Sequence, residues 1–90
     1  MARYTISDLR NDVARYNGYL EEMGSSVRFR EQGRNGYQAI DEYEIQAGGS
    51  WSCMRMVGGG TSREVLGYMA ERYGAIYTRS LEDQINALKA

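Results

Sequence analysis

The sequence predicts an α+β fold in which one helix precedes three strands and a second helix follows them. Three observations support this prediction. Apolar residues recur every three or four positions near the start, they alternate with polar residues in the middle, and a helix-capping signature introduces a second three-to-four repeat. A chain of 90 residues holds a single domain. A three-stranded antiparallel sheet with both helices packed on one face is the simplest arrangement that buries every apolar stripe.

The first helix is predicted over residues 5–23. Thr5 is a suitable N-cap with Asp8 three positions later, and Gly24 is a natural stop. Apolar residues recur every three or four positions and form one face of this helix: Ile6, Leu9, Val13, Tyr16, Leu20 and Met23.

The next two elements are predicted as strands over residues 26–31 and 37–46, joined by a tight turn at Asn35-Gly36. In the first strand Val27 and Phe29 alternate with arginines. In the second strand, one set of alternate positions is mostly apolar and contains Tyr37, Ala39, Tyr43 and Ile45. Asp41 falls on this parity, so we expect its carboxylate at the edge of the sheet, paired with an arginine such as Arg55, or in a site.

A third strand is predicted over residues 51–57, where WSCMRMV precedes three glycines. Trp51, Cys53 and Val57 share one side and Met54 and Met56 the other, so the strand lies beneath helices or against a partner. With one face covered, the two methionines form an adaptable exposed surface. Cys53 is expected to be a small buried side chain.

The second helix begins at a capping box formed by Thr61 and Glu64 and is predicted over residues 61–78. It either continues or breaks before a C-terminal segment, 80–88, at Gly74 or at the Ser80-x-x-Asp83 pattern. A break lets the segment fold back, which we favour. A continuous helix leaves Leu81, Ile85 and Leu88 as an oligomer interface that needs another chain to cover it.

The composition argues against catalysis. There is no histidine and one cysteine, which removes the usual general base, the Cys-His nucleophile pair and the commonest zinc ligand. We therefore expect no enzyme activity, no metal and no other cofactor. No segment has the length and apolarity of a membrane span, and the single cysteine fits a reducing compartment, so a cytoplasmic protein is predicted.

One candidate site is an anion pocket at the glycine-rich end of the third strand. Glycines before a capped helix leave backbone donors and a positive dipole end available to a phosphate or carboxylate. The residues expected to form it are Arg55, Gly59, Gly60, Thr61 and Arg63. The alternative is that these glycines merely let the strand turn into the helix.

A second candidate is a partner-binding surface on the sheet. Arg28 and Arg30 project from one face of the first strand, and Arg34 and Tyr37 lie close by in the sequence. Interleaved basic and aromatic groups suit an acidic protein patch or RNA. Nearby glutamates offer the alternative of a solvated face stabilised by cross-strand ion pairs.

Two resemblances bear on function. The element order, with glycines and Ser62-Arg63 in GGGTSREVLGYMAERY, resembles the double-stranded RNA-binding domain, which implies a phosphate contact at Arg63. Glu64 departs from the lysine cluster of that family. The size, the lack of histidine and segments such as NGYQAIDEYEI resemble small bacteriophage and prophage orphan proteins, which include anti-CRISPR inhibitors of bacterial defence.

We therefore expect a non-enzymatic binding protein that inhibits a host protein or ribonucleoprotein complex by occupying a surface. The alternatives are a nucleic-acid-binding domain and a protein that sequesters a phosphate-bearing small molecule. A net charge of −1 disfavours strong nucleic-acid binding. A homodimer through the C-terminal helix is also among the expectations.

Overall fold

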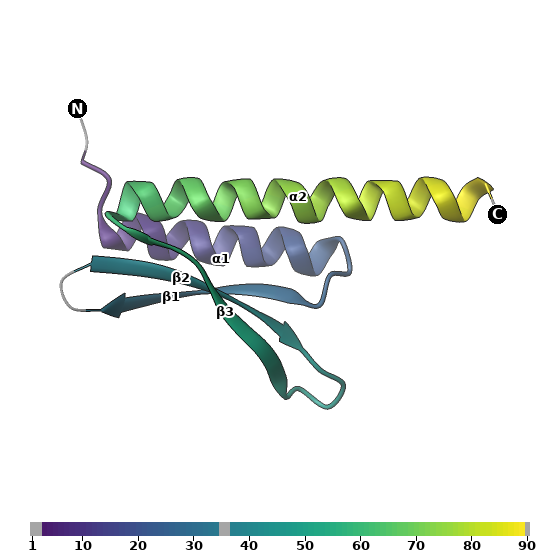
Figure 1. Ribbon diagram of the computed structural model, residues 1–90, viewed down its shortest axis with the longest axis horizontal. Coiled ribbons are helices and arrows are strands. Elements are labelled where there is room, and N and C mark those ends of the chain that lie inside the picture. Colours follow the sequence, from purple (N-terminus) through teal and green to yellow (C-terminus); the bar gives the residue numbers. More distant parts are fainter. Residues whose placement is uncertain (1–2, 35–36, 90) are drawn as a thin grey trace.

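The computed structural model describes residues 3–34 and 37–89 of the chain, and the side chains of Arg34 and Cys53 lie outside this description. The predicted order of elements is confirmed (Figure 1). The elements are α1 (Ile6–Glu22), β1 (Val27–Arg34), β2 (Tyr37–Ile45), β3 (Trp51–Gly60) and α2 (Ser62–Lys89). The turn predicted at Asn35-Gly36 falls outside the described residues.

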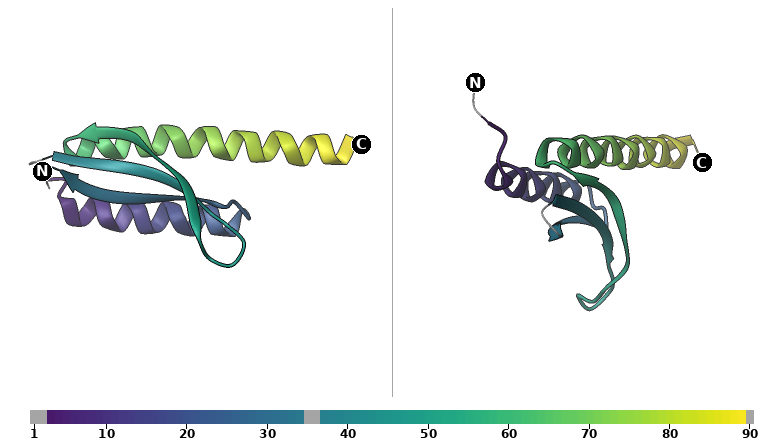
Figure 2. Two further views of the ribbon diagram at one scale, coloured as in Figure 1. Left: turned by 60° about the horizontal axis from the view of Figure 1, so that its bottom comes forward. Right: turned by 60° about the vertical axis from the view of Figure 1, so that its left-hand side comes forward.

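The fold has two layers, as predicted. The antiparallel sheet has the order β1-β2-β3, and both helices pack on one of its faces, as Figures 1 and 2 show. The core lies between the layers and consists of Leu9, Val13, Leu20, Phe29, Ile40, Val65 and Met69. The opposite face of the sheet is covered by no described element.

α1 begins and ends where the sequence predicts. Thr5 and Asp8 form a reciprocal capping box, and Gly24 follows the helix with a φ of 77°. The side chain of Asn17 holds α1 to the outer edge of β1, because it donates to the Phe29 carbonyl at 2.9 Å and accepts from the Phe29 N–H at 2.8 Å. Two backbone groups of an edge strand are thereby satisfied.

The faces of β2 are the reverse of those predicted from its apolar parity. Phe29, in the core, is directly opposite Glu42, so Ile40 and Glu42 lie on the helix side. Asp41 and Tyr43 lie on the other side. Asp41 is 2% exposed in the central strand, so an edge position is excluded. The pattern failed because Glu42, itself buried, has an ion-pair partner, Arg72, on α2.

β3 is longer than the predicted 51–57, because its pairing continues through Gly58, Gly59 and Gly60. The register with β2 shifts between Ile40 and Asp41, which leaves Val57 as an extra residue that packs against the core. Gly58 is required by close packing, since a Cβ there would meet the Tyr68 ring at 2.3 Å. These glycines continue the strand and do not interrupt it.

α2 is one uninterrupted helix of 28 residues, so the predicted break and fold-back are wrong. Gly74 weakens a helix by about 1 kcal/mol relative to alanine, which is not enough to end it. The Ser80 hydroxyl accepts a hydrogen bond from the Gln84 side chain at 3.4 Å, within the continuing helix. The last turns of α2 extend beyond the sheet and α1 (Figure 1). Neither described helix combines the length and apolarity that a bilayer crossing requires.

Candidate binding surfaces

The uncovered face of the sheet carries a cluster of aromatic, methionine and arginine side chains, which we call the sheet patch: Arg30, Tyr43, Trp51 and Met54. These four residues line a shallow hollow of about 90 Å³. The rings of Tyr43 and Trp51 meet edge to face with centroids 6.2 Å apart, and Trp51 is 56% exposed. An exposed tryptophan supported by a second ring is the kind of group that fills a pocket on a partner protein.

Of the predicted partner-binding residues, only Arg30 belongs to the sheet patch. The Arg28 guanidinium turns back and donates to the carbonyls of Ser25 and Val27 at 2.6 and 2.7 Å, which fixes the start of β1. Tyr37 is exposed at the other end of β2, near Gly59. The Arg34 side chain lies outside the described part. The sequence did not indicate Tyr43 or Trp51, because their parity marked them as core.

The predicted anion pocket is not assembled as expected. The N-terminus of α2 carries its own carboxylate in a capping box: the Thr61 N–H donates to Glu64 Oε1 and the Glu64 N–H donates to Thr61 Oγ1, both at 3.2 Å. The Glu64 carboxylate lies beside Gly60. A second anion would meet this carboxylate, which opposes its binding.

The two arginines assigned to that pocket have different partners. The Arg63 guanidinium lies 6.0 Å from the centre of the Tyr4 ring, near the start of α1. Arg55 extends from the middle of β3 towards Glu42, with 3.8 Å between Nη2 and Oε1. The proposed pairing of Arg55 with Asp41 is therefore replaced by pairing with Glu42.

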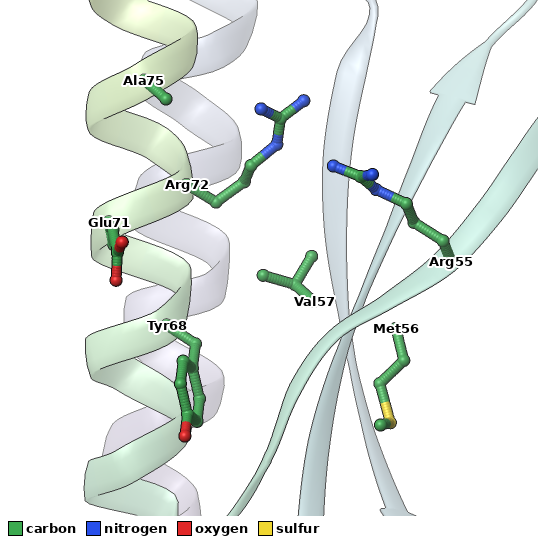
Figure 3. Close-up of a pocket in the computed structure, with 7 residues that line it drawn as sticks. All are labelled: Arg55, Met56, Val57, Tyr68, Glu71, Arg72 and Ala75. Atoms are coloured by element: carbon green, nitrogen blue, oxygen red, sulfur yellow. The ribbon is translucent and has the colours of Figure 1, made fainter.

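Arg55 forms one wall of a groove between β3 and α2 (Figure 3), with a volume of about 470 Å³. Its guanidinium and that of Arg72 approach one another from opposite walls, and Val57 lies on the groove wall below them in this view. Glu42 is 7% exposed and forms ion pairs with both arginines. Arg72 donates from Nε to Oε1 at 2.5 Å and from Nη2 to Oε2 at 3.2 Å. Sequence reasoning placed Glu42 on a solvated face and missed this centre.

The two arginines of this groove form ion pairs with Glu42 that stabilise the fold. The hydrogen bonds that Arg72 donates to Glu42 raise the pKa of Arg72 above its ordinary value, so its guanidinium stays charged at physiological pH. One carboxylate bound by two arginines leaves a single local positive charge, and exposed Glu71 lines the same groove. The arrangement ties α2 to the sheet and leaves little net attraction for an external anion.

Four tyrosines meet where α1 and α2 run side by side: Tyr16, Tyr19, Tyr73 and Tyr77. The rings of Tyr16 and Tyr73 are 5.0 Å apart, and Tyr73 and Tyr77 are stacked at 6.2 Å. Burial raises the pKa of Tyr73, which keeps its phenol neutral. Tyr16 and Tyr73 pack against the core, whereas Tyr19 and Tyr77 are exposed.

The predicted interface residues of α2 are all exposed on the turns that extend beyond the body. Leu81, Ile85 and Leu88 are 41%, 51% and 87% exposed. No described element covers them. Among residues 3–34 and 37–89, no three side chains of the metal-ligating types gather at one point.

Comparison of the chain with protein-family models, curated proteins and solved structures finds no significant match. The fold class is therefore described from the structure itself: an α+β domain with an antiparallel sheet and a long C-terminal helix.

Proposed function

We propose that this protein is a non-enzymatic binding protein that acts by occupying a surface of a host protein or ribonucleoprotein complex and thereby inhibits it. The observation that carries the proposal is the sheet patch, where Trp51 stands exposed on an uncovered face beside Tyr43 and Arg30. Tryptophan, tyrosine, methionine and arginine are the residue types enriched at protein interfaces.

The geometry supports Trp51 as the anchor of this contact. It opens β3 at the end of the β2–β3 hairpin that extends away from both helices (Figure 1), so a partner can approach without touching the helical layer. The Tyr43 ring meets the indole edge to face, so the two rings present one continuous aromatic surface to a partner. Arg30 supplies a charge-assisted donor at the rim.

The resemblance to small phage proteins directs the choice of target class. An inhibitor of a bacterial defence complex needs a compact domain and a surface that competes for a site, and it needs no catalytic group. Nucleic-acid binding and phosphate sequestration receive less support, because the Glu64 carboxylate lies at the start of α2, where it accepts from the Thr61 N–H, and because both groove arginines pair with Glu42.

The test uses the full chain, immobilised, and a lysate of a bacterium with an active CRISPR system. We expect one discrete complex to be retained, and expression of the chain in that strain to raise the plaque count of a targeted phage. Trp51→Ser should abolish both effects. Tyr19→Ser, which removes a similarly exposed ring from the helical side, should preserve both.

Salt and nuclease separate this function from the alternatives. Retention through an aromatic anchor should persist in about 0.5 M salt, where the Debye length is only about 4 Å. Binding carried by phosphate contacts falls steeply with added salt. The proposal would be contradicted if wild type and Trp51→Ser were retained equally. It would also be contradicted if nuclease treatment abolished retention and the purified protein components of the target did not bind the chain.

A further inference from the structure

We propose that the chain forms an antiparallel homodimer through α2, in which the large apolar residues of one copy fill glycine-lined positions on the other. This inference is independent of the proposed function and rests on one face of α2. Gly67, Gly74, Leu81 and Leu88 follow one another at intervals of seven residues. Seven residues are nearly two helical turns, so the four positions share that face.

Neither Gly67 nor Gly74 is required by packing within the described part of the chain. Both are exposed, and a Cβ added at either would have no neighbour within 4 Å. Each lies inside a long helix, where glycine costs about 1 kcal/mol relative to alanine. By contrast, Gly58 is required by the Tyr68 ring. An interior glycine without an intramolecular reason is explained when another helix approaches closely.

The two leucines of this face, Leu81 and Leu88, are large apolar residues that the monomer leaves exposed. Leu81 and Leu88 belong to the C-terminal part of α2, whose last turns extend beyond α1 and the sheet (Figure 1), and they are 41% and 87% exposed. Ile85, on the same flank, is 51% exposed. This apolar stripe continues a helix that is fully formed to Lys89, so no fold-back covers it. A second copy supplies the missing surface.

One antiparallel register matches each of the three exposed aliphatic residues with a small one. A twofold axis between Tyr77 and Thr78 sets Leu81 opposite Gly74 of the second copy, and the same axis sets Leu88 opposite Gly67. Ile85 then lies opposite Ala70. A twofold interface repeats each contact, so these matches occur twice. A parallel pair would set glycine against glycine and leucine against leucine, which leaves gaps at one end.

The charged pairs in this register offset one another, because Lys89, the one lysine of the chain, comes near Glu64 of the second copy at the same spacing at which Glu82 comes near Glu71. The register therefore rests on the match of large residues with small ones. In a parallel pair each Lys89 faces the other Lys89. The paired stretch from Gly67 to Leu88 is about 30 Å long, and it brings the exposed turns of each copy alongside the folded body of the other.

The experiment is sedimentation equilibrium of the purified full chain over a range of concentrations. We expect a concentration-dependent dimer. Gly74→Leu fills the receiving position and should weaken association about 30-fold, the loss typical of a strong interface contact. Ala75→Leu makes the same kind of change on the other side of α2 and should leave association unchanged. Circular dichroism checks that each variant remains folded.

A compensating pair tests the register. Leu81→Ala alone should weaken association about 10-fold, whereas Gly74→Leu combined with Leu81→Ala exchanges large and small residues and should return it to within about threefold of wild type. A wild-type chain that stays monomeric at millimolar concentration, equal effects of Gly74→Leu and Ala75→Leu, or a double variant as weak as Gly74→Leu would overturn the proposal.

Disulfide trapping gives the orientation. In a Cys53→Ser background, Thr78→Cys should cross-link, because residues 78 lie beside the axis, within disulfide reach. Leu88→Cys should not, because the two residues 88 lie about 30 Å apart. Cross-linking through residue 88 in place of 78 would overturn the antiparallel arrangement. Trp51→Ser should leave the dimer intact, so failure of either proposal is distinguishable from failure of the other.

Discussion

Replacing Arg72 with methionine tests whether the Glu42 centre holds α2 on the sheet. Glu42 is buried and accepts two hydrogen bonds from Arg72, while its other cation, Arg55, lies at 3.8 Å and is mostly exposed. Breaking a fully buried ion pair costs about 3–5 kcal/mol, because a charge is left without its partner. The Arg72 side chain is 34% exposed, so water can replace part of its contact. We therefore expect a loss of about 2–3 kcal/mol.

Thermal and urea unfolding measure this loss. For a domain of this size each kcal/mol shifts Tm by about 4–8 °C, so Arg72→Met should lower Tm by about 10–20 °C. Glu42→Leu combined with Arg72→Leu removes both charges, and it should recover most of the stability, since a packed apolar pair replaces a buried ionic pair at little cost.

A matched control is Arg10→Met, which removes the exposed pair of Arg10 and Glu31 at 3.4 Å. Exposed pairs contribute about 0–1 kcal/mol, so this variant should unfold near the wild-type temperature. If Arg72→Met loses no more stability than Arg10→Met, or if the double variant is as unstable as the sum of its single changes, Glu42 and Arg72 are not coupled and the reasoning fails.

Three further predictions concern local structure. Gly58→Ala should destabilise the fold by about 1–3 kcal/mol in urea unfolding, since its Cβ meets the Tyr68 ring, and adding Tyr68→Ala should relieve most of that clash; no relief would show that the ring is not the obstacle. Thr61→Ala should cost about 1 kcal/mol through loss of the α2 cap, and an unchanged denaturation midpoint would argue against the capping box. The pKa of Asp8 is lowered, mainly by the hydrogen bond that its carboxylate accepts from the Thr5 N–H. The ionised Asp8 therefore stabilises the fold above about pH 3.9, and this stabilisation is lost as the pH falls through the pKa of Asp8 in the folded state. A midpoint for the Asp8 carboxyl at or above about 3.9 in an NMR titration would disprove this.

The helices were predictable because their signals are local. A capping box requires two side chains three residues apart, and both boxes form as the sequence indicates. The apolar spacing of α1 likewise identified Leu9, Val13 and Leu20, which are buried. Gly24 ends α1 for the same local reason, since a positive φ favours glycine.

The faces of β2 were not predictable, because they depend on a partner far away in the sequence. Glu42 looks like a solvent-facing strand residue until Arg72, thirty positions later, neutralises it. Once Glu42 faces the helices, Tyr43 must face the other way, so a residue that the alternation marked as core becomes part of the sheet patch. The bulge at Val57 adds a second non-local change, which no alternation of apolar residues reveals.

The outer end of the β2–β3 hairpin should open locally without unfolding of the whole domain. Residues 44–51 are all exposed, and this end receives no packing from the helices (Figure 1). Its backbone is held by the strand ladder and the short turn bonds between Gln46 and Ser50 and between Gln46 and Gly49. Its amide protons should therefore exchange through local openings that cost far less than global unfolding. Trp51 is thus mounted on the most adaptable segment of the sheet, and a bound partner would slow exchange there first.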